Sequence, residues 1–280
     1  MWRQGIMTML RDRRTSREDF IFFVDRLATY LIERAMEHLP HKPKTVVTPE
    51  AVEYQGQELD AHVSVSSNAT RQAKADICIE ARRCVHPTLV SVEYVPAATQ
   101  SLTSPSGGPL ERGLRRVVHN VAIGSLLIQS EPKTGEPLLL HLALPQRVRE
   151  RALAPQTFVF LLDAQIGTAA SAFMAIRVLL DHGVPQEHII FVTFLVAKLG
   201  GIVVLRKAFP RVRIVCSAVD EGLSERWLEV IGDGEGLADG EGLRSPEMSR
   251  SGPEGRKVWV VEPGMGHIGS CVYTFLASSG

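Results

Sequence analysis

The chain has 280 residues, 45% of them apolar and 22% charged, which is typical of one large or two small globular domains. Its 31 basic and 31 acidic side chains cancel, so no overall positive field favours nucleic acid or an anionic membrane as a partner. The four cysteines are scattered, and no run approaches the roughly 20 apolar residues of a membrane span. We therefore expect a reducing compartment, the cytoplasm or the nucleus.

The first quarter of the chain predicts a helix and a hairpin. Residues 19–39 place apolar side chains at helical spacing, with charged side chains between them. Ser16 precedes this stretch as a candidate N-cap, and Pro40 ends it. Residues 44–59 contain short β-branched runs around a proline and a glycine, which favours a hairpin or flap.

The remaining elements alternate between strands and helices. A continuous apolar run at 157–163 predicts a strand buried on both faces, and the periodic pattern at 172–183 predicts a helix. Further strands are expected at 121–129, 138–145, 189–196 and 211–219. This order predicts a single α/β domain over residues 1–280, with a parallel sheet flanked by helices.

Two segments do not follow this order. Residues 62–109 are rich in Ser, Thr, Pro and Gly, and residues 233–257 contain the repeat GEGLADGEGL with almost no large apolar side chain. A segment of this composition cannot bury enough apolar area to offset its ordering entropy. We expect the second segment to be a disordered surface excursion.

The connection from Asp163 to Ser171 is the first candidate site. It joins a buried strand to a helix, where backbone N–H groups and the helix dipole can bind an anion. Gly167 permits close backbone approach, and Thr168 and Ser171 offer hydroxyls. The alternative is a plain strand–helix connection, because such loops are common.

A second candidate site is VVEPGMGHIG, residues 260–269, whose last six residues match G-x-G-x-x-G. A dinucleotide fingerprint follows the first strand, opens a helix and is trailed by an acid about 20 residues on. Here the printed sequence ends soon after the glycines, which leaves no room for that unit. The glycines would instead give the backbone a tight path past a ligand.

Several blocks in order resemble uracil phosphoribosyltransferases, most closely the corresponding C-terminal domain of uridine-cytidine kinase-like proteins. These blocks are GIMTMLRDRRTSREDFIFFVDRL, RGLRRVVHNVAIGSLLIQSEPKTGEP, the strand and loop ending DAQIGTAAS, FPRVRIVCSAVD and VVEPGMGHIGSCVYTF. The resemblance covers residues 5–61, 110–232 and 258–274, so 62–109 and 233–257 are excursions outside the family pattern. It implies a type I phosphoribosyltransferase-like sheet with a small hood that carries the base-binding loop.

The resemblance also implies a reaction, which joins uracil to phosphoribosyl pyrophosphate and releases UMP and pyrophosphate. Asp163 would be the catalytic residue and would hold the ribose hydroxyls. Phosphoribosyl pyrophosphate would bind along the connection named above, at Asp163, Ala164, Gln165, Ile166, Gly167, Thr168, Ala169, Ala170 and Ser171. Uracil would bind Val261, Gly266, His267 and Ile268. Mg²⁺ would accompany the substrate, the chain would form a homo-oligomer, and GTP is a candidate effector because it activates some members.

Three departures from the family pattern predict impaired activity. The motif S-I-L-R-A-G-E, whose arginine contacts pyrophosphate, has no counterpart in the matched blocks. Ala169 replaces a glycine of the phosphate loop, and His267 and Ser270 replace the acids of the uracil loop. The alternative is a catalytically silent nucleotide-binding or oligomerising regulator of pyrimidine salvage. G-x-x-x-x-G-K-(S/T) does not occur, so this chain lacks a kinase phosphate loop, and no ligand spacing indicates a protein-held metal.

Overall fold

The computed structural model describes residues 2–60, 86–94, 108–118, 121–130, 136–228 and 256–266. Its helices are α1 (Trp2–Arg11), α2 (Arg17–Met36), α3 (Gly108–Val117), α4 (Gln146–Arg149), α5 (Ala170–Asp181) and α6 (Val203–Ala208). Its strands are β1 (His41–Val47), β2 (Glu53–Leu59), β3 (His86–Tyr94), β4 (Ala122–Ser130), β5 (Pro137–Ala143), β6 (Thr157–Ile166), β7 (Ile189–Ala197), β8 (Arg213–Asp220), β9 (Gly222–Leu228) and β10 (Arg256–Glu262). Short 3₁₀ turns lie at Ala154–Gln156 and Gln186–His188, and a π-helical turn at Lys198–Ile202 leads into α6.

Six strands form the central sheet, in the order β5-β4-β3-β6-β7-β8. The pairs from β4 to β8 are parallel, and β5 joins the edge antiparallel to β4. Two smaller antiparallel sheets complete the described fold: β1 pairs with β2, and β9 pairs with β10. The predicted parallel α/β sheet is therefore confirmed, and the β9–β10 ribbon is the small hood.

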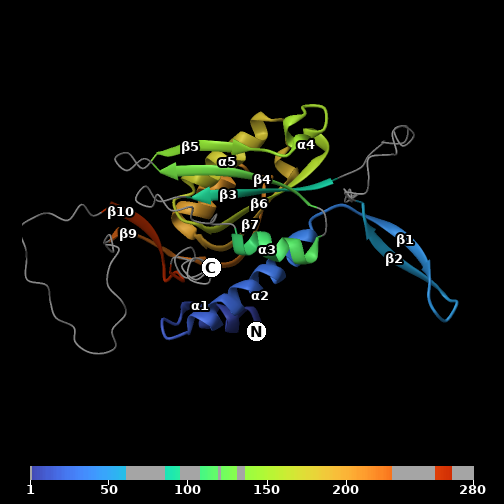
Figure 1. The fold of residues 1–280 in the computed structure, drawn as a ribbon, viewed down its shortest axis with the longest axis horizontal. Helices are drawn as coiled ribbons and strands as arrows, with labels where there is room; N and C mark the ends of the chain where they lie inside the picture. The colour runs from blue at the N-terminus through green and yellow to red at the C-terminus, as the bar shows by residue number, and fades with distance from the viewer. Residues whose placement is uncertain are drawn as a thin grey trace, which may run out of the picture.

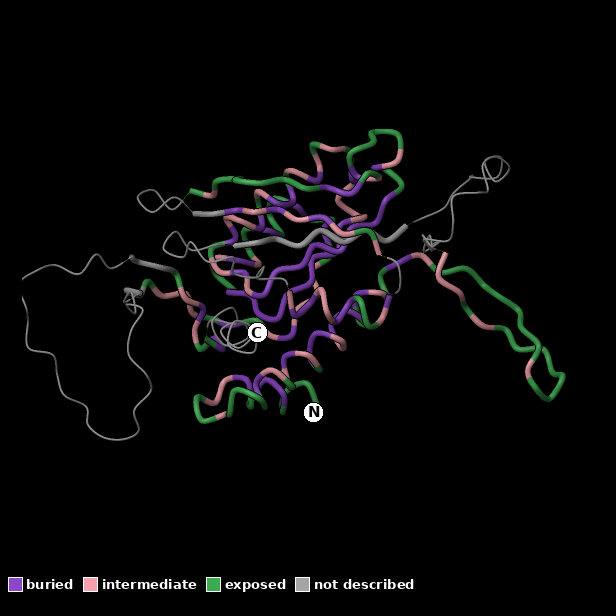
Figure 2. The backbone as a smooth tube through the Cα atoms, viewed as in Figure 1, coloured by how far each residue is buried: buried purple, intermediate pink, exposed green. Residues whose placement is uncertain are grey.

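Helices cover both faces of the sheet, and each face has its own apolar core. α1, α2 and α3 pack on one face, and α5 packs on the other (Figure 1). Leu205 of α6 belongs to the same core as α5. Every residue of β7 is buried, as are nine of the ten in β6 (Figure 2). The β1–β2 hairpin extends away from this body and is mostly exposed (Figure 2). None of the helices in the described ranges is long and apolar enough to cross a membrane.

Local signals account for the ends of two predicted helices. The hydroxyl of Ser16 accepts a 3.1 Å hydrogen bond from the N–H of Asp19, which caps α2 as expected. α5 ends before Gly183, whose φ of 96° closes the helix in the left-handed region. The expected strands and the hairpin are present, with ends shifted by a few residues.

Two expectations need correction. β6 does not end at Asp163 but continues to Ile166, because its backbone pairing with β7 persists through Gln165 and Ile166. Residues 62–109 are not wholly outside the sheet, since they contain β3 and the first residues of α3. β3 lies between β4 and β6, so this segment contributes one of the inner strands of the sheet. Most of the second expected excursion lies outside the described residues, whose last segment begins at residue 256.

Candidate functional site

The phosphate loop, defined as residues 163–171, runs from the last third of β6 into the first turn of α5. Asp163, Ala164 and Ile166 are buried, whereas Thr168 is exposed. The Thr168 hydroxyl lies 3.5 Å from the N–H of Ala170, the first residue of α5. The amides at the start of this 12-residue helix therefore follow a buried strand, which is the arrangement that binds anions in α/β proteins.

Ala169 occupies a backbone conformation that favours glycine. Its φ is 68° and its ψ is 4°, in the left-handed region, where an L-residue with a Cβ is strained by about 1–2 kcal/mol. Its side chain is 4% exposed and packs in the core on the α5 side of the sheet. The fold therefore retains a turn suited to glycine at the position where the sequence supplies alanine.

The base loop, defined as residues 261–268, begins with the last two residues of β10, and the structure describes it as far as Gly266. Val261 is buried and pairs with Leu223 of β9. Gly264 and Gly266 have φ values of 62° and 74°, so both adopt the left-handed conformation that glycine allows. A Cβ on Gly264 would lie 2.2 Å from the Val261 carbonyl oxygen, whereas one on Gly266 would meet no atom within 4 Å. His267 and Ile268 lie outside the described residues.

The two loops meet, although about 100 residues separate them in the sequence. The Gln165 side-chain amide donates a 2.7 Å hydrogen bond to the carbonyl oxygen of Gly266. A Cβ on Gly167 would lie 3.6 Å from the Leu223 side chain and 4.0 Å from the Val261 side chain, so Gly167 faces the hood. The structure therefore brings together Gln165, Gly167, Val261 and Gly266, which sequence analysis had assigned to two separate ligands.

Two glycines behind the phosphate loop were missed by sequence analysis. A Cβ on Gly200 would lie 3.0 Å from the Gly167 carbonyl oxygen and 3.4 Å from the Thr168 Cα. A Cβ on Gly201 would lie 3.0 Å from the Ile166 carbonyl oxygen. The π-helical turn after β7 can thus approach the loop because it carries two glycines. The signal was the Gly-Gly pair itself, directly after a buried strand.

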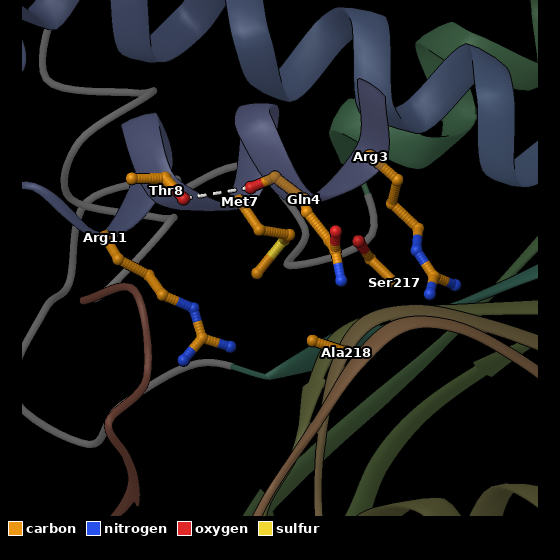
Figure 3. Close-up of a pocket in the computed structure, with 7 residues that line it drawn as sticks. All are labelled: Arg3, Gln4, Met7, Thr8, Arg11, Ser217 and Ala218. Carbon is orange, nitrogen blue, oxygen red and sulfur yellow. Dashed lines mark hydrogen bonds between the residues drawn. The ribbon is translucent and has the colours of Figure 1, made fainter. Parts of the chain in front are cut away.

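A partly buried cysteine and an open cleft are alternative candidate sites among the described residues. Burial raises the pKa of the Cys216 thiol, which keeps it protonated and argues against a thiolate nucleophile there. An open cleft of about 440 Å³ lies between α1 and β8, but none of its lining residues belongs to either loop (Figure 3). We assign the candidate site to the two loops, because they contact each other and expose backbone groups suited to an anion, whereas the cleft includes no residue of either loop.

The acidic side chains decide whether the candidate site suits a magnesium ion. Among the described residues, no group of three His, Cys, Asp or Glu side chains is placed to hold a metal. Asp163 is the single acid of the phosphate loop. Mg²⁺ commonly takes one or two carboxylates and completes its shell with waters and substrate phosphates. The donor set therefore suits an ion that arrives with a pyrophosphate-bearing ligand.

Comparison with solved structures supports the class of fold. The chain superimposes on the AQ2163 protein from Aquifex aeolicus with a TM-score of 0.58 and 18% identity, over 97% of this chain and 94% of that one. With the central sheet, the strand–loop–helix of the phosphate loop and the hood, the fold is an α/β, type I phosphoribosyltransferase-like one.

The chain belongs to the uracil phosphoribosyltransferase family. The family model described as "Uracil phosphoribosyltransferase" matches residues 2–67 and 105–236. Uracil phosphoribosyltransferase from Dictyostelium discoideum is 34% identical over 83% of this chain and 88% of its own length. Uridine-cytidine kinase-like 1 from Mus musculus is 33% identical over 82% of this chain, and the alignment spans 35% of that longer protein. The family match includes the phosphate loop, whereas β10 and the base loop lie beyond residue 236.

Proposed function

We propose that this chain binds uracil and phosphoribosyl pyrophosphate at the joined phosphate and base loops and forms UMP with low turnover. The observation that carries the proposal is the hydrogen bond from Gln165 to the Gly266 carbonyl. It links a loop suited to phosphate with a loop whose exposed glycine, Gly266, offers backbone groups to a planar base. Family membership supplies the substrate class, because relatives of similar length are named uracil phosphoribosyltransferase.

In the proposed reaction the N1 atom of uracil releases its proton to solvent and forms a bond to C1 of the ribose. The bond from C1 to the pyrophosphate oxygen breaks, and pyrophosphate leaves with the bonding electrons. Positive charge builds on the ribose as this bond breaks. The protein lowers the barrier by holding the two reactants in line and by stabilising the leaving group electrostatically.

Five residues of the two loops have specific roles in this proposal. Asp163 would hold the ribose hydroxyls and share Mg²⁺ that arrives with the substrate. The Thr168 hydroxyl and the first amides of α5 would bind the 5′-phosphate. Val261 and the backbone at Gly266 would contact uracil, and Gln165 would keep the two loops in register. Bound Mg²⁺ would neutralise negative charge on the departing pyrophosphate.

We infer low turnover from the alanine at position 169 and from the missing arginine motif. The left-handed backbone at Ala169 lies where amides must approach phosphate, and its methyl group is strained there. Loss of one preorganised electrostatic contact commonly lowers kcat about 10²–10³-fold. The same departures favour a second candidate function, a catalytically silent nucleotide-binding regulator of pyrimidine salvage. Ligand binding without turnover would identify that function.

Ligand titration tests the shared site. We expect ribose 5-phosphate and uracil each to bind, and Thr168→Val to weaken ribose 5-phosphate affinity by about tenfold, the effect of losing one hydrogen bond to a charged group. Gln165→Met should weaken uracil binding more than ribose 5-phosphate binding, because it removes the hydrogen bond to the Gly266 carbonyl oxygen of the base loop.

Matched controls are available in the same chain. Thr8 is exposed on α1 and donates to the Gln4 carbonyl, so Thr8→Val should leave both affinities unchanged. Gln186 accepts a hydrogen bond from the N–H of Arg211. It precedes β7, at the opposite end of the parallel strands from the phosphate loop, so Gln186→Met should also leave both affinities unchanged. Equal effects of the loop variants and these controls would place the ligands elsewhere.

A further inference from the structure

Asp220 is a buried acid that sequence analysis did not assign to the site. It is the last residue of β8 and pairs in register with Ala197, the last residue of β7. Only 4% of Asp220 is exposed. A carboxylate this deeply buried needs charged and hydrogen-bonding partners, because its transfer from water is otherwise costly.

Within the described part of the chain, each carboxylate oxygen of Asp220 has a partner, and the two partners come from opposite ends of the sequence. Oδ1 lies 2.6 Å from the guanidinium of Arg11, the last residue of α1. Oδ2 accepts a 2.8 Å hydrogen bond from the N–H of Gly264 in the base loop. One buried side chain therefore joins α1, the end of β8 and the base loop.

The hydrogen bond from Gly264 to Asp220 lies at a tight turn of the base loop. Gly264 is buried, its φ is 62°, and its backbone packs so closely that a Cβ would overlap the Val261 carbonyl oxygen. A fixed acceptor for the Gly264 N–H holds this turn in one conformation. The direction of the turn sets where Met265 and Gly266 point their backbone groups.

Arg11 in turn holds Asp220 in place. Its side chain is 25% exposed and borders the open cleft between α1 and β8, alongside Arg3, Gln4 and Thr8 (Figure 3). The guanidinium thus lies between solvent and the buried carboxylate. Without Arg11 the buried carboxylate would lose the cation that lies beside it, and it would move toward water.

We propose that Asp220 is a positioning residue for the base loop, held by Arg11, so that the N-terminal helix controls the geometry of uracil binding. This inference rests on the proposed function of the base loop. Asp220 acts through the Gly264 backbone and does not itself contact uracil. The pair thereby connects α1 to the base loop, which is the proposed uracil site.

The test uses the full chain, four single variants and the double variant Arg11→Met with Asp220→Asn. Asp220→Ala removes the acceptor for Gly264, Asp220→Asn keeps an acceptor oxygen without the charge, and Arg11→Met removes the ion pair. The control is Arg14→Met, because Arg14 is an exposed arginine near the end of α1 that pairs with Asp12 on the surface. The readouts are amide exchange at Gly264, uracil affinity and ribose 5-phosphate affinity.

We expect Asp220→Ala and Arg11→Met to speed Gly264 exchange and weaken uracil binding by about tenfold or more. Ribose 5-phosphate affinity should stay within about twofold, which a general loss of structure would not allow. Asp220→Asn should have a smaller effect, and adding it to Arg11→Met should recover part of the loss because the unpaired charge disappears. Arg14→Met should match the unmodified chain.

Two outcomes separate this inference from the proposed function. Unchanged Gly264 exchange in both Asp220→Ala and Arg11→Met overturns the positioning role, whether or not uracil binds. Failure of the unmodified chain to bind uracil overturns the proposed function, and Gly264 exchange alone then decides whether Asp220 fixes the loop. If Asp220→Ala does not fold, Arg11→Met and Asp220→Asn provide the same comparison.

Discussion

The two left-handed glycines of the base loop give a prediction that separates backbone strain from steric overlap. Gly264→Ala and Gly266→Ala make the same chemical change two residues apart, at φ values of 62° and 74°. Each places a Cβ in the left-handed region, at a cost of about 1–2 kcal/mol. Only the Cβ at Gly264 meets another atom, the Val261 carbonyl oxygen at 2.2 Å. Overpacking of this kind adds about 1–3 kcal/mol.

We therefore expect Gly266→Ala to cost about 1–2 kcal/mol and Gly264→Ala about 2–5 kcal/mol, the sum of both terms. The cost can be expressed as lost global stability or as a local opening of the loop. Urea denaturation measures the first and uracil affinity the second, so both are measured for each variant. Indistinguishable effects of the two substitutions on both quantities would refute the geometry of the base loop described above.

Three further predictions concern other parts of the fold. Ala169→Gly should tighten ribose 5-phosphate binding and change the free energy of unfolding by less than about 1 kcal/mol. The relief of about 1–2 kcal/mol of backbone strain offsets the loss of a buried methyl group worth about 0.8 kcal/mol. Unchanged ribose 5-phosphate affinity contradicts the inference that strain at Ala169 weakens phosphate binding. Gly124→Ala should destabilise the fold by about 1–3 kcal/mol, because its Cβ would lie 2.5 Å from the Ala143 carbonyl oxygen. Gly5→Ala, whose Cβ would meet no atom within 4 Å, should instead stabilise α1 by about 0.5–1 kcal/mol. Equal unfolding free energies of the two variants contradict this prediction. Burial lowers the pKa of His188 from its ordinary 6.5, so below pH 6.5 the unfolded chain binds more protons than the folded chain and the free energy of unfolding should fall as pH drops. In the His188→Gln variant the free energy of unfolding should depend less steeply on pH. An unaltered pH dependence contradicts this prediction.

Continuous apolar runs made the central sheet predictable from sequence. β6 and β7 are almost wholly buried, and each is a run of large apolar side chains that few other structures accommodate. The end of β6 was misplaced because Asp163 interrupts the run, although backbone pairing with β7 does not depend on the side chain. β3 was missed because its short run HPTLVSVEY lies inside a segment whose overall composition resembles a loop.

The two loops of the candidate site could be predicted from the sequence, but the contacts that join them could not. The phosphate loop follows from a strand, a glycine and a helix start that are adjacent in sequence. The contact of Gln165 with Gly266 joins residues 101 positions apart, and no local pattern encodes it. The role of Asp220 depends in the same way on a residue from each end of the chain. Such contacts arise only from the packing of the hood and α1 against the sheet.

Conversion of isotope-labelled uracil to UMP, with phosphoribosyl pyrophosphate and Mg²⁺, tests the central claim most directly. The comparison is between the unmodified chain and a variant that carries Ala169→Gly, His267→Asp and Ser270→Asp. We expect labelled UMP from both, formed only when phosphoribosyl pyrophosphate is present, and at a higher rate with the variant. Equal rates would contradict the inferred impairment, and the absence of labelled UMP from both chains would contradict phosphoribosyl transfer at the joined loops.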